Sequence, residues 1–409
     1  MTDIRHKALQ LHEKYKGKLI VEAKMAVKDL DDLSLVYSPG VAEPCKVIAE
    51  HREKVYDYTM KGNLIAVISD GTAVLGLGNI GPEAAIPVME GKALLFKLFA
   101  GIDAFPLCLD TTDVDRIVET VKLLKPTFGG INLEDIAAPN CFIIEERLKK
   151  EMDIPVFHDD QHGTAVVAMA GLINAVKLVG KQLHQIKVVV NGAGAAGVAV
   201  VKLLIKFGIS DIILCDSKGA IYEGRPTGMN AEKDELALQT NRSMITGPLT
   251  EAVTGADVFI GLSMPGVLTS EMVSTMNSDP IVFALANPVP EIMPEDAKRG
   301  GAKVVGTGRS DYPNQINNVL AFPGIFRGAL DVQATQINEE MKIAAVYAIS
   351  NLVNPDQLCA EYIIPEPLDN RVVPAVASAV AKAALDSGVA RKNVIPSYQE
   401  NNHSIIIHS

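Results

Sequence analysis

Short apolar runs alternate with helical patterns along most of the chain. In the first part, β-type runs are expected at 63–69, 104–110, 128–135 and 154–159. Helical patterns separate these runs, at 83–99, 113–124 and 141–152. Pro87 predicts a break in the first helix, and Thr112 predicts a cap for the second. This alternation is typical of a parallel sheet that helices cover on both faces.

A second β/α series begins after a long apolar helical stretch. This stretch starts at Thr164 and is apolar on nearly all sides, so we expect it to be buried between two domains. Strands are then expected at 186–190, 211–216, 256–263, 281–286 and 303–308. The polar segment 218–254 predicts an irregular insertion with a short helix, and the chain after Ala321 is mostly helical.

Length, charge and cysteine content narrow the class of protein. The 409 residues, 48% of them hydrophobic, suit two domains with sizeable cores. The net charge of −11, without a Lys/Arg-rich block, argues against nucleic acid and anionic membranes as partners. The five cysteines form no C-x-x-C pair, which argues against structural zinc and disulfides. With no signal-like segment and no run long enough to span a bilayer, we expect a cytoplasmic protein.

The pattern G-x-G-x-x-G occurs twice, and the context distinguishes the two copies. The copy at Gly192 follows a β-branched strand, opens an unbroken helix and precedes a strand that ends in Asp216. Its glycines permit a tight turn, and the helix N-terminus offers free N–H groups to a pyrophosphate. Asp216 could bind the ribose hydroxyls of a dinucleotide. The predicted phosphate-binding residues are Gly192, Gly194, Ala195, Ala196 and Gly197.

The other copy, at Gly76, Gly78 and Gly81, lacks this context. Pro82 and Pro87 interrupt the segment after these glycines, so we interpret this copy as a substrate-domain loop where backbone segments pass closely.

The chain is therefore predicted to have an α/β fold of two domains. An N-terminal α/β substrate domain is expected over residues 1–160, a Rossmann NAD(P)-binding domain with C-terminal helices over 161–390, and a tail over 391–409. The preference between NAD and NADP stays open. Asp216 would repel a 2′-phosphate and favours NAD, whereas Lys218 could bind that phosphate.

Acidic residues follow three successive strands of the first domain. They are Asp110, then Glu134 with Asp135, then Asp159 with Asp160. Parallel strands bring their carboxyl ends to one edge of a sheet, where ligands bind. A lone Asp110 is typical of a helix cap or a turn. The two pairs would repel each other unless a cation lay between them.

The residue types around these pairs indicate the kind of cation. Carboxylates suit Mg²⁺ or Mn²⁺, whereas His158 and His162 raise zinc or iron as an alternative. Because neighbouring residues of a strand point to opposite faces, Asp159 is expected to diverge from His158 and from Asp160. One carboxylate of this stretch would then join the Glu–Asp pair of the preceding strand. His162 is interpreted as a polar residue near a helix start.

A dinucleotide beside a divalent cation permits an oxidation followed by a metal-assisted step. Hydride would leave C2 of a 2-hydroxy acid while a base takes the hydroxyl proton, and a β-carboxylate would then leave as CO₂. Lys92, a lone cation among apolar helical residues, is the candidate base if its pKa is lowered, and a surface-reaching lysine is the alternative. Tyr37, at a strand-like end before a Pro-Gly turn, could donate a proton or simply pack.

Eight motifs together resemble malic enzyme in its short bacterial-type form. They are YSPGVAEPC, DGTAVLGLGNIGPEA, MEGKALLFKLFAGID, NLEDIAAPN, FHDDQHGTA, NGAGAAG, ANPVPE and NNVLAFPG. The resemblance extends from about residue 20 to residue 385. It implies oxidative decarboxylation of (S)-malate to pyruvate and CO₂ with NAD or NADP and Mg²⁺ or Mn²⁺, and decarboxylation of oxaloacetate. It also implies self-association as a homodimer or a higher homo-oligomer.

The resemblance assigns roles to individual residues. Tyr37 resembles the general acid, Lys92 the base that also contacts substrate, and Asp159 the partner of that lysine. The residues that resemble the metal ligands are Glu134, Asp135 and Asp160. Those that resemble the groups holding malate and the nicotinamide end are Asn287, Asn317 and Asn318.

One position departs from the longer members of the family. Where they carry an arginine that grips a malate carboxylate, this chain has Ala73. Asparagines or a lysine of a partner subunit could supply that contact, and Lys18 is a candidate. A malolactic-type lyase that retains its nucleotide, a non-catalytic nucleotide-binding module and an amino-acid dehydrogenase are the competing hypotheses.

Overall fold

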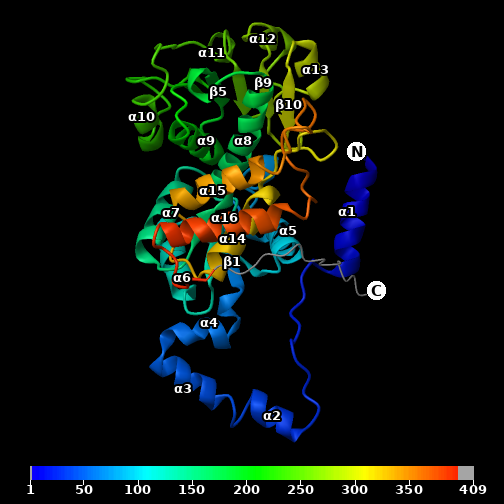
Figure 1. The fold of residues 1–409 in the computed structure, drawn as a ribbon, viewed down its shortest axis with the longest axis vertical. Helices are drawn as coiled ribbons and strands as arrows, with labels where there is room; N and C mark the ends of the chain where they lie inside the picture. Colours follow the sequence, from blue (N-terminus) through cyan, green and yellow to red (C-terminus); the bar gives the residue numbers. More distant parts are fainter. Residues whose placement is uncertain (1, 395–409) are drawn as a thin grey trace.

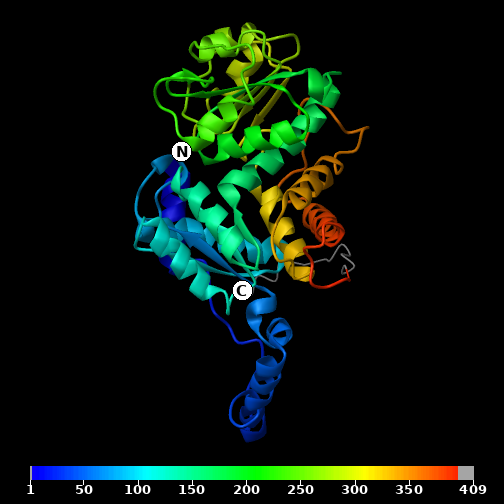
Figure 2. The same ribbon diagram turned by 90° about the vertical axis from the view of Figure 1, so that its left-hand side faces the viewer.

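The chain folds around two β-sheets stacked along its long axis, with an arm that projects from one end (Figures 1 and 2). The computed structural model describes residues 2–394, so the predicted tail from residue 395 onward lies outside the described residues. The predicted α/β fold with a Rossmann domain is confirmed. No helix within residues 2–394 is long and apolar enough to cross a membrane.

The first sheet has four parallel strands in the order β2-β1-β3-β4. The strands are β1 (Leu64–Ser69), β2 (Asp103–Cys108), β3 (Gly130–Leu133) and β4 (Val156–His158). Helices α5 (Pro82–Ala100), α6 (Val114–Leu124) and α7 (Asn140–Glu151) connect them. Since all four strands are parallel, their carboxyl ends share one edge, and the acidic residues follow β3 and β4 there.

Two local predictions in this domain are wrong. Helix α5 runs without a break through Pro87, because four buried apolar side chains anchor it to the sheet on both sides of the proline. The cap of α6 is Asp113, whose Oδ1 accepts the N–H of Arg116 at 2.9 Å, and not Thr112.

The second sheet is a Rossmann sheet with the order β10-β9-β8-β5-β6-β7. Its parallel strands are β5 (Lys187–Asn191), β6 (Asp211–Asp216), β8 (Val258–Gly261), β9 (Ile281–Ala284) and β10 (Val304–Thr307). Only the short β7 (Gly219–Ala220) is antiparallel. The helices are α9 (Ala195–Lys206), α10 (Ala231–Ala237), α11 (Leu249–Ala252), α12 (Ser270–Ser274) and α13 (Pro294–Arg299). The segment predicted as an irregular insertion holds β7, α10 and α11.

Helix α8 (Asp159–Leu178) links the two sheets and is buried along most of its length, as predicted. It begins at Asp159 and not at Thr164. Asp159 and Asp160 therefore lie in the first helical turn, so the strand geometry used to separate them is wrong. Successive helical residues diverge by about 100° instead of 180°.

The C-terminal helices pack back onto the first sheet. They are α14 (Phe322–Asp331), α15 (Glu339–Ser350) and α16 (Val372–Asp386). Phe326 of α14 is fully buried, and its ring centroid lies 5.3 Å from that of Phe96 and 5.8 Å from that of Phe157. Aromatic packing of this kind fixes one domain against the other.

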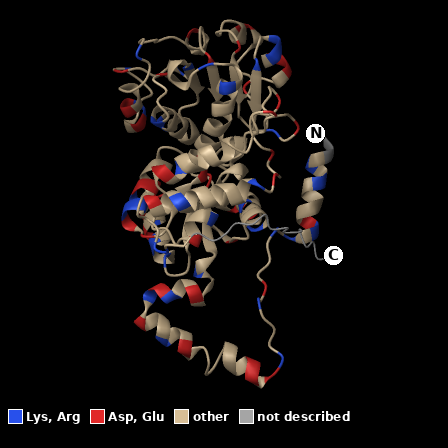
Figure 3. Cartoon of the chain, in the orientation of Figure 1, with Lys and Arg blue, Asp and Glu red and all other residues tan. Residues whose placement is uncertain are grey.

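The N-terminal part differs from the rest of the fold. Helix α1 (Thr2–Tyr15) lies beside the body, whereas α2 (Leu30–Val36), α3 (Ala42–Glu50) and α4 (Val55–Tyr58) form the projecting arm. No residue of these three arm helices is buried, and both signs of charge occur along them (Figure 3). The arm exposes Leu30, Leu33, Leu35, Val36, Tyr37 and Val41.

Candidate active site

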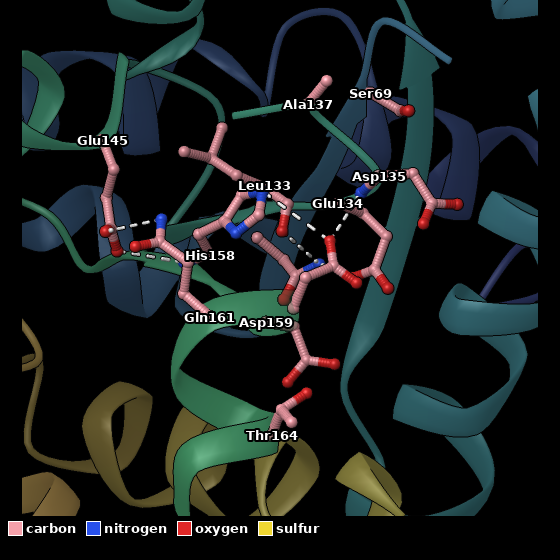
Figure 4. Close-up of polar contacts among 12 residues, drawn as sticks. Ser69, Leu133, Glu134, Asp135, Ala137, Glu145, His158, Asp159, Gln161 and Thr164 are labelled. Carbon is pink, nitrogen blue, oxygen red and sulfur yellow. Dashed lines mark hydrogen bonds and ion pairs between the residues drawn. The ribbon is translucent and has the colours of Figure 1, made fainter. Parts of the chain in front are cut away.

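Four carboxylates converge where β3 and β4 end (Figure 4). Glu134 and Asp135 follow β3, and Asp159 and Asp160 form the first turn of α8. The structure brings Glu134, Asp135 and Asp160 together, with one ligand oxygen from each lying within 4.8 Å of the others. Asp135 has a left-handed backbone with φ 54°, and its N–H donates to Asp160 Oδ2 at 2.8 Å. That bond joins the two strand ends directly.

The carboxylates of this cluster oppose one another. Burial, followed by the charge of Asp160, raises the pKa of Asp135 to about 8. Burial and the neighbouring carboxylates also raise the pKa of Glu134 well above its usual range, although Lys92 opposes this. Holding several carboxylates in one buried place is unfavourable without a compensating cation.

A divalent cation fits these residues. Asp135 Oδ2 and Asp159 Oδ1 are buried and have no hydrogen-bond partner within residues 2–394. An all-carboxylate set suits a hard ion such as Mg²⁺ or Mn²⁺ better than zinc. Glu134, Asp135 and Asp160 would hold such an ion.

Lys92 is held inside the cluster and does not reach the surface. Its side chain is 10% exposed, and Nζ lies 2.6 Å from Asp159 Oδ2 and 2.9 Å from Glu134 Oε1. Nζ also lies 4.2 Å from the ring centroid of Phe322. Burial lowers the pKa of Lys92, but the charges of Asp159 and Glu134 outweigh it and raise the pKa. The expected lowering of this pKa is therefore wrong for the protein without a bound cation.

One asparagine of the second domain, Asn318, is hydrogen-bonded to Asp159. Asn318, at the start of a 3₁₀ turn (Asn318–Leu320), donates from Nδ2 to Asp159 Oδ2 at 3.1 Å. Thr164 Oγ1 donates to Asn318 Oδ1 at 3.1 Å. A Cβ at Gly163 would lie 1.9 Å from Asp159 Oδ1, which explains the glycine in this turn. Asn317 instead caps the 3₁₀ turn, and its Oδ1 accepts the N–H of Val319 at 3.0 Å.

A cleft of about 660 Å³ lies between the two domains and is lined by half of the predicted site residues. From the first domain it is lined by Lys18, Ala73, Lys92, Glu134, Asp135 and Asp160, and from the second by Ala196, Ser263, Asn287, Asn317 and Asn318. Lys18 Nζ donates to Pro87 O at 2.7 Å, and burial lowers the Lys18 pKa. Lys18 therefore reaches the cleft of its own chain.

The two glycine patterns have different surroundings. Gly192 has φ 121°, and a Cβ there would lie 2.2 Å from the carbonyl oxygen of Leu262. Gly194 precedes α9 and faces open space, which leaves the helix N-terminus accessible to a phosphate. In the other copy, a Cβ at Gly76 would lie 2.7 Å from Asn287 O, so this loop is a close contact between the domains.

The carboxylate predicted to bind ribose is already paired with cations. Asp216 accepts from Arg225 Nη2 at 2.8 and 2.9 Å, from Lys233 Nζ at 2.8 Å and from the N–H of Lys218 at 2.9 Å. Burial opposes ionisation, but the bonds from Lys233 and Arg225 hold the pKa of Asp216 below its usual value. Arg225 and Lys233 were not predicted from the sequence, because they lie in the segment interpreted as irregular.

Tyr37 and the two histidines near the acidic pair, His158 and His162, do not line the cleft. Tyr37 directly follows α2 at the outer end of the arm and is 69% exposed, so the structure does not bring it near Lys92 (Figure 1). The strand-like backbone expected there is the end of a helix. His162 Nε2 lies 2.9 Å from both carboxylate oxygens of Glu145, away from the cluster. The fully buried ring of His158 lies against the cluster, with Nε2 3.6 Å from Asp160 Oδ2.

A Rossmann domain that faces a buried lysine and a carboxylate cluster across one cleft defines an NAD(P)-dependent oxidoreductase. The malic enzyme N-terminal domain family matches residues 16–149, and the malic enzyme NAD-binding domain family matches residues 161–385. The chain belongs to the malic enzyme family, and the resemblance noted from its motifs is confirmed.

Individual relatives agree with this assignment. A bifunctional malic/malolactic enzyme of Bacillus subtilis is 69% identical over 96% of each chain. An NAD-dependent malic enzyme of Geobacillus stearothermophilus is 59% identical over 93% of this chain and 79% of its own length. The crystal structure of an NAD-dependent malic enzyme from Thermotoga maritima is 50% identical, with a TM-score of 0.88 over 91% of this chain and 98% of that chain.

Proposed function

We propose that the chain oxidatively decarboxylates (S)-malate to pyruvate and CO₂, reduces NAD⁺ or NADP⁺, and depends on Mg²⁺ or Mn²⁺. The contact of Lys92 with Asp159 and Glu134, in a cleft that also opens to the nucleotide turn, carries this proposal. A group that accepts a proton, a set of oxygen ligands and a dinucleotide site are the parts that this reaction needs. The same parts would decarboxylate oxaloacetate.

Lys92 is the base in this proposal, and Asp159 orients it. Only a neutral amine can accept the malate hydroxyl proton. The two carboxylates that pair with Lys92 Nζ favour its charged form, so the base needs a further positive charge nearby. A divalent ion on Glu134, Asp135 and Asp160 would offset their negative charge, favour the neutral amine and stabilise negative charge on the substrate oxygen. Asn318 would keep Asp159 in place while the proton moves.

Lys18 supports the binding of a malate carboxylate. It lines the same cleft as Ala73, which stands where longer relatives have an arginine. Its ammonium group already bonds a backbone carbonyl and can add a carboxylate partner. Asn287 and Asn317 line the opposite wall and offer amide groups to the substrate or to the nicotinamide end.

A second copy of the chain would supply Tyr37 as the general acid, which makes the active form a homodimer or a larger homo-oligomer. Tyr37 is remote from its own cleft, on an arm that projects from the body (Figure 2). That arm exposes several large apolar side chains. Isologous dimers exchange identical surfaces, so an arm that enters the partner's cleft is matched by the partner's arm in return. The tyrosine could then protonate the enol carbon after CO₂ leaves.

The cations around Asp216 support the use of NADP⁺ as well as NAD⁺. Arg225 and Lys233 neutralise the carboxylate that would otherwise repel a 2′-phosphate, and Lys218 lies beside the same loop. Rotation of either cation away from Asp216 would free that carboxylate for the ribose hydroxyls of NAD⁺.

Conversion of malate to lactate and CO₂ with the nucleotide retained is the second candidate function. The name of the Bacillus subtilis relative, a bifunctional malic/malolactic enzyme, favours it. The same base and metal ligands would serve, but the reduced nucleotide would return its hydride to pyruvate before dissociating.

Replacement of the base tests the reaction. Lys92→Met should lower malate-dependent NAD(P)H formation with Mn²⁺ by about 10²–10⁴-fold. Lys97→Met on the same helix is the matched control, because its exposed ammonium pairs only with Asp103 on the outside of the domain. Full wild-type activity in excess chelator would contradict the metal requirement. CO₂ release without net NAD(P)H would favour the malolactic reaction.

A change in the charge near Asp216 tests nucleotide selectivity. Lys233→Gln should weaken NADP⁺ binding by about tenfold or more and NAD⁺ binding much less, since only NADP⁺ loses a charge-assisted hydrogen bond. Lys206→Gln, at the exposed end of α9, should change neither affinity. Equal weakening of both nucleotides, measured by fluorescence titration, would contradict this use of Lys233.

Mixed subunits test the contribution of Tyr37. Tyr37→Phe and Lys92→Met should each be nearly inactive alone. After the two variants are dissociated and reassociated together, half of the molecules are hybrids with one intact site, so about a quarter of wild-type activity should return. If the mixture stays inactive although gel filtration and labelled subunits show hybrids, Tyr37 and Lys92 do not act in one shared site.

A further inference from the structure

Glu145 of α7 is a buried carboxylate that the proposed reaction does not use. Its side chain is 7% exposed, and it lies on the side of the β4–α8 junction away from Glu134 and Asp135 (Figure 4). Four donors converge on it, and three of them belong to the turn that carries Asp159 and Asp160. A charge buried at this position requires such partners.

The three bonds from the turn enclose the two aspartates. Before them, the N–H of His158 donates to Glu145 Oε1 at 3.1 Å. After them, Gln161 Nε2 donates to Oε2 at 3.3 Å, and His162 Nε2 lies 2.9 Å from both oxygens. The fourth donor, Lys149, lies 2.7 Å from Oε1 on the same helix as Glu145. Glu145 therefore holds the backbone on both sides of Asp159 and Asp160.

The hydrogen bonds around Glu145 continue to the C-terminal helix α15. Lys342 of α15 is buried, and its Nζ lies 3.2 Å from His162 Nδ1. Because an ammonium group can only donate, Nδ1 accepts from Lys342, which places the ring proton on Nε2. Lys149 Nζ also lies 3.4 Å from Nε2, but the two Glu145 oxygens at 2.9 Å are the closer partners and accept that proton. Lys342, His162 and Glu145 thus form one chain of hydrogen bonds from α15 to α7 behind the cluster.

Glu145 contacts the turn from the side opposite to Glu134 and Asp135. Asp160 lies beside these two carboxylates, and like charges so close would repel one another wherever they are ionised. Glu145 accepts hydrogen bonds from the His158 amide and from the Gln161 and His162 side chains. These bonds fix the start of α8 and so keep the distance from Asp160 to Glu134 and Asp135. A metal site needs ligand positions held to within a few tenths of an ångström.

We infer that Glu145 is a positioning residue for the metal-binding turn, which it holds through His158, Gln161 and His162. This inference rests on the proposed function, since it concerns the divalent ion on Glu134, Asp135 and Asp160. Glutamine at position 145 would keep one acceptor oxygen and turn an NH₂ group toward the remaining donors, so at least one donor would lose its partner.

Metal affinity without substrate is the direct test. Mn²⁺ binding, measured from the free-ion signal in electron paramagnetic resonance, should weaken by about 10–100-fold in Glu145→Gln. Glu146→Gln is the matched control, because Glu146 is the next residue of the same helix, is exposed and forms an ion pair with Lys150 on the surface. It should bind Mn²⁺ as the wild type does, and NAD(P)⁺ affinity should be unchanged in both variants.

A second pair of variants tests the same link without a change at Glu145. Gln at position 162 can still donate to Glu145, so His162→Gln should keep Mn²⁺ affinity near the wild-type value, whereas His162→Leu should weaken it. Wild-type affinity in both Glu145→Gln and His162→Leu would overturn the inference. So would an equal loss of Mn²⁺ and NAD(P)⁺ affinity, because that result indicates general unfolding. If Asp160→Asn bound Mn²⁺ as tightly as the wild type, the proposed metal site itself would be wrong.

Discussion

Four carboxylates, three of them buried, that gather beside one lysine are the constraint on which the rest of this structure depends. Glu134, Asp135 and Asp160 place one oxygen each within 4.8 Å of the others, and Lys92 pairs with Glu134 and with Asp159. Burial, and after it the neighbouring carboxylates, raises the pKa values of Glu134 and Asp135, so their ionised forms are unfavourable here without a further cation. A divalent cation is the compensation that this arrangement fits, and its charge would also release the proton-accepting form of Lys92.

The fold holds these groups together from three directions. The parallel sheet brings the ends of β3 and β4 to one edge, and the N–H of Asp135 bonds Asp160 across it. Lys92, on helix α5, forms an ion pair with Asp159, and Asn318 of the second domain donates a hydrogen bond to Asp159. Glu145 holds the start of α8 from behind. Lys92 and Asp159 bond each other, and Asn318 of the second domain bonds Asp159. Movement of one domain relative to the other would therefore alter the position of Asp159 and of Lys92.

Much of the fold and part of the site could be predicted from the sequence. The period of apolar residues gave the order of strands and helices, and the acidic pairs after β3 and β4 indicated a hard cation. The start of α8 was misplaced because polar residues of a first helical turn have no apolar period. Arg225 and Lys233 were missed because they lie in the segment interpreted as irregular. Glu145 was missed because only the tertiary fold brings α7 against the start of α8. The position of Tyr37 depends on an arm that gains no burial within one chain.

The stability of the protein without metal tests the central claim most directly. With excess chelator at neutral pH, Asp135→Asn should raise the free energy of unfolding by on the order of 1 kcal/mol, because it removes an acid whose pKa is raised to about 8 by burial and by the charge of Asp160, and which is therefore unfavourable to fold into this site. Added Mn²⁺ should then stabilise the wild type but not this variant. Asp110 is an exposed acid that follows β2, outside the carboxylate cluster, so Asp110→Asn should behave as the wild type in both conditions. If Asp135→Asn were less stable than the wild type in chelator and Mn²⁺ stabilised both equally, the account of a charge-strained metal site would be contradicted.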